Sequence, residues 1–149
     1  MDPAGMVEQL KQHLPAILEG RPVLLAYLYG SVSTGYVHPF SDVDIALVLD
    51  PRQGLDPYQQ LTLELEIEAQ LEHVAGIRDA DVRAISGAPL RVQGKVVTQG
   101  ILLYSRDEEF RIAFEVATRR RYFDFLPVLH MMQQAYLARL GQELETRGA

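Results

Sequence analysis

The pattern of apolar and polar residues divides the first part of the chain into a helix followed by two strands. Residues 6–19 place apolar side chains three and four positions apart, which is the spacing of a helix with one buried stripe. Pro15 lies inside this segment and predicts a kink or an early end. Residues 23–29 (VLLAYLY) and 43–49 (VDIALVL) are short continuous apolar runs, typical of buried strands.

Residues 57–74 carry two conflicting signals. Apolar and polar residues alternate in LTLELEIEAQL, and this period alone predicts a strand. The segment is also rich in Leu, Glu, Gln and Ala, which favour a helix. Asp56 followed by Pro57 is a good helix start, and Gly76 is a good stop. We therefore predict a helix.

The remaining residues predict further strands and two C-terminal helices. Residues 79–85 (DADVRAI) indicate a third strand, and residues 90–104 indicate two short extended pieces separated by glycine turns, with a helical turn as the alternative. Ser105 and Glu108 match a capping box that opens a helix. The arginines at 119–121 then close this helix, where its dipole favours positive charge. A last helix is expected over roughly 124–145.

These elements predict an α/β (α+β two-layer) fold, a small mixed β-sheet with flanking helices. The length of 149 residues favours one domain, 1–149, with a core over about 6–104 and C-terminal helices over about 105–145. The absence of cysteine excludes disulfides and thiolate metal sites and suits a cytoplasmic protein. We see no signal peptide and no apolar run long enough for a membrane span.

The charge balance argues against a nucleic-acid-binding protein. The net charge is −6, from 20 acidic and 14 basic residues. Proteins that grip nucleic acid through its backbone usually need a basic surface. Only the arginines at 119–121 form a concentrated basic cluster, so direct nucleic-acid binding is not expected.

Two aspartates at the start of the second strand form the first candidate site. Asp42 and Asp44 are two positions apart, so on a strand they point to the same face. Two carboxylates side by side are unfavourable unless water or a cation compensates, and oxygen ligands at this spacing suit Mg²⁺. An isolated Asp-x-Asp is nevertheless common, and exposure to solvent is the better explanation for these two residues taken alone.

The end of the preceding strand is the second candidate site. Gly30 and Ser31 expose backbone amides and a hydroxyl with no bulky side chain nearby, an arrangement that binds anions. An ordinary turn is the simpler explanation for these residues taken alone. Together with Asp42 and Asp44, however, they provide a phosphate cradle and a metal-binding pair on adjacent strand ends, as a metal–nucleotide site requires.

The stretch GSVSTGYVHPFSDVDIAL, residues 30–47, resembles the GSX10DXD signature of the DNA polymerase β-like nucleotidyltransferases. The short chain and the early motif are similar to the minimal nucleotidyltransferases (MNT proteins), which are often antitoxins paired with HEPN-domain toxins. The resemblance implies a polymerase β-like core, phosphate binding by Gly30 and Ser31, and metal binding by Asp42 and Asp44.

The family pattern also implies a third carboxylate on a later strand. Asp81 lies between apolar Ala80 and Val82, so we assign it this role, with Asp79 as a competitor. The resemblance implies that Asp42, Asp44 and Asp81 hold Mg²⁺, as two ions, and are the catalytic residues. Asp81 would lie nearest the attacking hydroxyl and take its proton.

The leading hypothesis is therefore transfer of a nucleoside monophosphate from an NTP, AMP from ATP by resemblance, to a hydroxyl with release of pyrophosphate. The resemblance implies a tyrosine of a cognate HEPN toxin as acceptor, which makes the protein an adenylylating antitoxin. One alternative is a small-molecule nucleotidyltransferase of the aminoglycoside-modifying kind, with an acidic acceptor pocket. The other is a non-catalytic antitoxin that neutralises by binding alone. Nucleotide preference, the number of groups transferred and the oligomeric state stay open.

Overall fold

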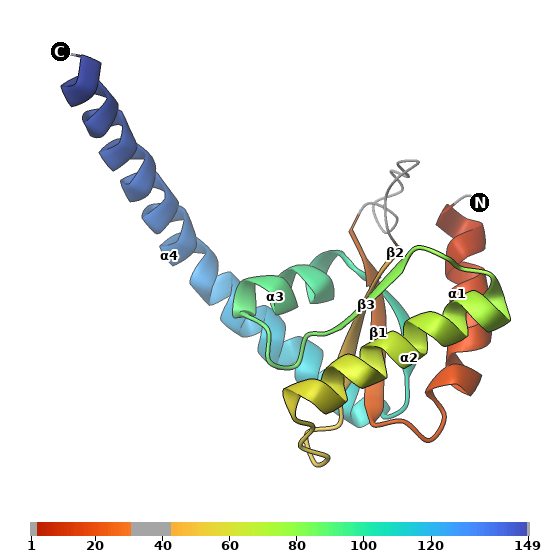
Figure 1. Ribbon diagram of the computed structural model, residues 1–149. Coiled ribbons are helices and arrows are strands. Elements are labelled where there is room, and N and C mark those ends of the chain that lie inside the picture. Colours follow the sequence, from red (N-terminus) through yellow and green to blue (C-terminus); the bar gives the residue numbers. More distant parts are fainter. Residues whose placement is uncertain (1–2, 31–42, 149) are drawn as a thin grey trace.

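The computed structural model describes residues 3–30 and 43–148, and in this part of the chain the strands form one mixed sheet (Figure 1). The helices are α1 (Pro3–Leu18), α2 (Pro57–Ala75), α3 (Leu90–Gln99) and α4 (Glu108–Gly148). The strands are β1 (Val23–Tyr29), β2 (Val43–Leu49), β3 (Ala80–Ala84) and β4 (Ile101–Ser105), in the spatial order β3-β2-β1-β4. The predicted fold class is confirmed.

Strands β1 and β2 form the buried centre of the sheet. They pair antiparallel to each other, and β1 pairs antiparallel to β4 on its other side. Strand β3 pairs parallel to β2 and is an edge strand. The continuous apolar runs in β1 and β2 follow from this position, because both of their faces are covered by helices.

Helices pack against both faces of the sheet, and each face has its own apolar cluster (Figure 1). On one face, Leu14 of α1 and Ile67 of α2 pack with Ile45 of β2. On the other face, Val96 of α3 packs with Tyr27 of β1 and Phe110 of α4 packs against the same cluster. Positions along β2 therefore alternate between the two clusters, and Asp44 belongs to the face that carries α3 and α4.

Three of the predicted elements match the structure closely. Both central strands have the predicted limits, 23–29 and 43–49. The ambiguous segment at 57–74 is a helix, α2, because the Asp56 side chain and Gln59 form a capping box and Gly76 ends the helix at a φ of 70°. The N-terminal helix continues past Pro15 to Leu18, so the proline does not end it there.

The prediction of two extended pieces over 90–104 is wrong. Residues 90–99 form the helix α3, and only 101–105 are extended, as β4. The buried residues of α3 are three and four positions apart, as on one face of a helix: Gln93, Gly94, Val96 and Val97. The alternative of helical structure in this segment is the correct one.

The predicted pair of C-terminal helices is instead one helix, α4, of 41 residues. It begins at Glu108, and the cap is Asp107, whose Oδ1 accepts a hydrogen bond from the Phe110 backbone N–H at 3.0 Å. Ser105 ends β4 and donates from its hydroxyl to the Glu108 carboxylate instead. The arginines at 119–121 are therefore inside α4, and helix-end charge compensation does not explain them.

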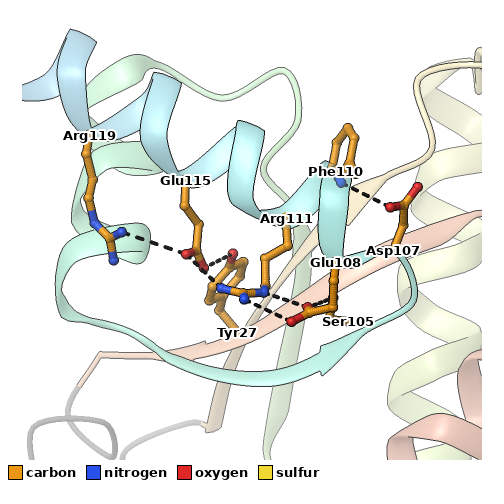
Figure 2. Close-up of polar contacts among 8 residues, drawn as sticks. All are labelled: Tyr27, Ser105, Asp107, Glu108, Phe110, Arg111, Glu115 and Arg119. Carbon is orange, nitrogen blue, oxygen red and sulfur yellow. Dashed lines mark hydrogen bonds and ion pairs between the residues drawn. The ribbon is translucent and has the colours of Figure 1, made fainter.

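The first four turns of α4 are fixed to the sheet by a polar network (Figure 2). The buried Tyr27 hydroxyl donates to Glu115 at 2.9 Å. Arg111 donates to Glu115 at 3.0 Å and also contacts Glu108, while Arg119 lies 3.7 Å from the Glu115 carboxylate. Burial, followed by the hydrogen bond to Glu115, raises the pKa of Tyr27, so the phenol stays protonated and keeps donating.

Candidate functional site

The structure brings three of the five predicted site residues to one end of the central strands. Gly30 directly follows β1, Asp44 is the second residue of β2, and Asp81 is the second residue of β3. The other two, Ser31 and Asp42, lie outside the described residues. The site can therefore be described from Gly30, Asp44 and Asp81 and the side chains around them.

Asp44 and Asp81 lie side by side on adjacent parallel strands. They are direct Cα partners in the pairing of β2 with β3. Neighbouring strands are about 4.8 Å apart, so two carboxylates at paired positions on one face are close neighbours. Two anions in this arrangement repel each other, and a cation between them removes the repulsion.

Tyr29 lies beside this pair of carboxylates, on a third strand. It is the Cα partner of Asp44 across the antiparallel β1–β2 pair, so Tyr29, Asp44 and Asp81 follow one another across the sheet. Burial raises the pKa of the Tyr29 phenol, and the negative charges of Asp44 and Asp81 raise it further. Tyr29 is not among the site residues that the sequence predicts, and its position just before Gly30 is the local signal that could have indicated it.

Gly30 is required by the geometry of this strand end. Its φ of 83° is in the left-handed region, which side chains rarely adopt. A Cβ at this position would lie 2.6 Å from the Asp44 Oδ2 atom. The backbone therefore passes directly over the Asp44 carboxylate, and only glycine allows both the conformation and the close approach.

Asp81 is held by an ion pair with Arg83. The Arg83 Nε donates to Asp81 Oδ1 at 3.1 Å, and the two side chains share one face of β3 because they are two positions apart. This bond is the main cause of the raised pKa of Arg83. Both side chains reach solvent, with the Asp81 side chain 32% exposed, so Asp81 is open to an incoming molecule.

Asp79, the competing candidate for the third carboxylate, precedes the strand. Residue 79 is exposed, and β3 begins at Ala80. The Asp79 backbone carbonyl accepts a hydrogen bond from the Val43 N–H at 2.8 Å, which aligns the starts of β2 and β3. Asp81, by contrast, is the residue in register with Asp44.

A cavity of about 430 Å³ opens beside Asp81 at the edge of the sheet. Glu64 and Glu68 of α2 line it together with Asp81 and Arg83. Both glutamates also bond to the edge strand: Glu68 accepts from the Val82 N–H at 2.9 Å and Glu64 from the Ala84 N–H at 2.7 Å. The α2 carboxylates thus cover backbone donors of β3 and give the cavity an acidic wall.

The residues at the strand ends fit a magnesium site. Carboxylate oxygens are the ligands that Mg²⁺ prefers, and it binds through one or two of them together with substrate phosphates. Asp44 and Asp81 offer such a pair in direct register. Within residues 3–30 and 43–148, no three His, Asp or Glu side chains group closely enough to hold a metal. The predicted triad needs Asp42, which is outside this part of the chain.

Comparison with family models gives a match to "Polymerase beta, Nucleotidyltransferase" over residues 12–109. This match covers well over half of the chain. The chain belongs to this nucleotidyltransferase family. The match includes Gly30, Asp44 and Asp81 and ends where α4 begins. A comparison with curated proteins gave no match.

Several solved structures that are similar to this nucleotidyltransferase are toxin–antitoxin structures. A toxin–antitoxin with AMP-PNP is 26% identical with a TM-score of 0.62, covering 87% of this chain and 97% of the other. A tyrosine-to-alanine mutant of the MntA–HpeT toxin–antitoxin is 25% identical (TM-score 0.61, 87% and 96% covered). The Shewanella oneidensis complex of a tri-AMPylated HEPN toxin with an MNT antitoxin shares the fold at 23% identity (TM-score 0.61, 91% and 98% covered).

These likenesses confirm the resemblance to the MNT antitoxins that the short chain and the early position of the GSX10DXD signature indicated. The described part of the chain contains no helix that is long and apolar enough to cross a membrane.

Proposed function

We propose that this nucleotidyltransferase moves AMP from ATP onto a tyrosine hydroxyl of a cognate HEPN toxin and so acts as its antitoxin. The observation that carries the proposal is the register of Asp44 with Asp81 beneath the glycine turn at Gly30. A carboxylate pair next to a backbone turn at a strand end suits a metal-bound triphosphate.

The similar structures support the choice of partner and nucleotide. The toxin–antitoxin at 26% identity contains AMP-PNP, an ATP analogue. AMP is the group transferred in our proposal. The HEPN toxin of the Shewanella oneidensis complex carries AMP groups, and one chain of that complex shares the fold of this protein. The choice of a tyrosine as the acceptor follows from the resemblance to the MNT antitoxins.

Each predicted residue has a defined part in the proposed reaction. Gly30 and Ser31 bind the phosphates of the leaving pyrophosphate through a backbone N–H and a hydroxyl. Asp42, Asp44 and Asp81 hold Mg²⁺, proposed as two ions, which offset the negative charge that develops around the α-phosphate.

Asp81 is also the proposed base. The tyrosine oxygen forms a bond to the α-phosphorus, the bond from that phosphorus to the oxygen bridging the β-phosphate breaks, and pyrophosphate leaves. The phenolic proton goes to the Asp81 carboxylate, which lies at the sheet edge where an acceptor can approach.

Intact-mass measurement of the toxin tests this proposal. The protein is incubated with Mg²⁺, each NTP in turn, and the HEPN toxin encoded beside it, and adducts are read by mass. We expect an AMP adduct with ATP that is lost with Asp44→Asn or Asp81→Asn and kept with Asp79→Asn, the matched control. Full neutralisation of the toxin by an Asp42→Ala, Asp44→Ala protein without any adduct would instead support antitoxin action by binding alone.

The acidic cavity favours a second candidate, transfer to a cationic small molecule. Glu64 and Glu68 line the cavity beside Asp81, as expected for an acceptor such as an aminoglycoside. The same assay with an aminoglycoside in place of the toxin distinguishes the two. A nucleotidylated aminoglycoside formed without any protein partner would favour the second candidate.

A further inference from the structure

The C-terminal part of α4 leaves the domain and projects into solvent (Figure 1). Tyr122 is the last buried residue of the helix, and we call residues 123–148 the projecting segment. Pro127 follows five residues later and has no N–H to donate to the Phe123 carbonyl, so the helix is weakest just where packing ends.

The projecting segment has the composition of a buried helix, although it is exposed. No Asp, Glu, Lys or Arg occurs between Asp124 and Arg139. Large apolar side chains are instead exposed to solvent by 44–67%: Phe123, Val128, Met131, Met132, Tyr136, Leu137 and Leu144. Soluble helices of this kind are normally covered, and contiguous exposed apolar surface indicates an interaction site.

The spacing of six of these residues places them on two opposite sides of the helix, and Met131 lies between the two sides. Val116, Phe123, Leu137 and Leu144 differ by multiples of seven and form one stripe. Val128, Met132 and Tyr136 follow at intervals of four and form a second stripe. At 100° per residue the two stripes lie roughly opposite each other. A single flat surface can cover only one of them, whereas a groove covers both.

The comparisons indicate which protein provides the groove. The family match ends at residue 109, so α4 lies almost entirely outside the shared nucleotidyltransferase domain. The match to the toxin–antitoxin with AMP-PNP covers 87% of the chain, more than residues 1–109 can supply, so it extends into α4. This helix is thus an addition to the catalytic domain that chains from toxin–antitoxin complexes share.

We infer that the projecting segment is a docking helix that inserts into an apolar groove of the HEPN toxin and contacts it with both stripes. The inference rests on the proposed function for the identity of the partner. Docking would keep the toxin close to the site, because Glu115 and Tyr122 attach the first turns of α4 to β1 and α3. The docking surface and the reacting residues are separate parts of the chain, so binding and transfer can be measured independently.

Two double variants of the full chain test the inference. Met132→Glu with Leu137→Glu places one charge in each stripe. Gln142→Glu with Thr146→Glu adds the same two charges at exposed polar positions of the same helix and is the matched control. Circular dichroism checks that both keep their helix, and a thermal shift with Mg-ATP checks that nucleotide binding is unchanged. Affinity for the toxin is measured by calorimetry, with co-elution in size-exclusion chromatography.

We expect the stripe variant to bind the toxin at least about 30-fold more weakly than wild type, and the control to stay within about threefold. AMP transfer should then need a higher toxin concentration while reaching the same maximal rate. Equal toxin affinity of the stripe variant and wild type would overturn the inference, as would a wild-type protein that does not bind the toxin.

The outcomes also separate this inference from the proposed chemistry. The stripe variant could lose the complex while even the wild-type protein forms no AMP adduct. This result would support the docking helix and contradict the proposed transfer reaction. A wild-type homodimer that the stripe variant dissolves, with unchanged toxin binding, would mean that a second copy of this chain covers the segment.

Discussion

Gly30 and Asp44 approach each other so closely that no side chain fits between them. The Gly30 Cα faces the Asp44 carboxylate, and an added Cβ would lie 2.6 Å from Oδ2. The strand that carries the phosphate-binding turn and the strand that carries the carboxylates are thus in contact at the point where both functions are needed.

Replacing Gly30 by alanine should therefore disable the site as well as strain the backbone. The Cβ would displace the Asp44 carboxylate, and small displacements of reacting groups can lower the rate by about 100-fold. Gly20→Ala is the matched control, since Gly20 has a similar φ of 77° but nothing within 4 Å of an added Cβ. Both variants should lose about 1–2 kcal/mol of stability. Only Gly30→Ala should lose AMP transfer, and equal transfer by the two variants would contradict the close-approach argument.

The row formed by Tyr29, Asp44 and Asp81 shows how far the sequence predicts this site. The motif spacing identified Gly30 and Asp44, and the apolar neighbours Ala80 and Val82 selected Asp81 over Asp79. The register of β1, β2 and β3 depends on pairing between distant segments, which local periodicity does not contain. Tyr29 was missed for this reason, because its relation to the carboxylates exists only across strands.

Errors in the predicted fold are confined to the second half of the chain. Residues 90–99 were misassigned because Gly94 was read as a turn, whereas it lies within α3 against the Tyr122 ring. The single helix α4 was divided in two because the three arginines at 119–121 resemble a helix end, although they lie inside the helix. Both assignments were decided by packing between α3 and α4, which local sequence signals do not specify.

The stability of the edge strand β3 should depend on two glutamates of α2. Glu64 and Glu68 accept hydrogen bonds from the Ala84 and Val82 N–H groups, which an edge strand would otherwise leave open. Glu64→Ala is expected to lower the free energy of unfolding by about 1–2 kcal/mol and to increase aggregation. Glu72→Ala, an exposed position on the same helix, should change it by less than about 0.5 kcal/mol. Urea unfolding and light scattering measure both, and equal effects of the two changes would refute the role of Glu64.

The junction of α3 and α4 should tolerate no side chain at Gly94. An added Cβ would lie 2.2 Å from Tyr122 ring atoms, inside the contact that seats α4. We expect Gly94→Ala to lower the free energy of unfolding by about 1–3 kcal/mol, because the added methyl group displaces the buried Tyr122 ring. Gly141 lies within α4, and an added Cβ there would have nothing within 4 Å, so Gly141→Ala should stabilise the protein by up to about 1 kcal/mol. Combining Gly94→Ala with Tyr122→Leu should cost less than the sum of the two single changes, and strict additivity would contradict a direct clash.

The contact between α4 and the end of β4 should make stability depend on acid pH through Glu108. Hydrogen bonds from Arg111 and then Ser105 lower the pKa of this carboxyl from 4.5 to about 2 (Figure 2). A group whose pKa is lowered by folding stabilises the folded state above its unfolded pKa, and this contribution disappears as pH falls from 4.5 toward 2. Glu108→Gln removes the titrating charge, so its melting temperature should lie below that of wild type near neutral pH and converge with it as the solution is acidified. Glu109→Gln removes a charge one residue further along the same helix turn and serves as the control. A constant difference between wild type and Glu108→Gln across this pH range would show that the ion pair with Arg111 adds nothing to stability.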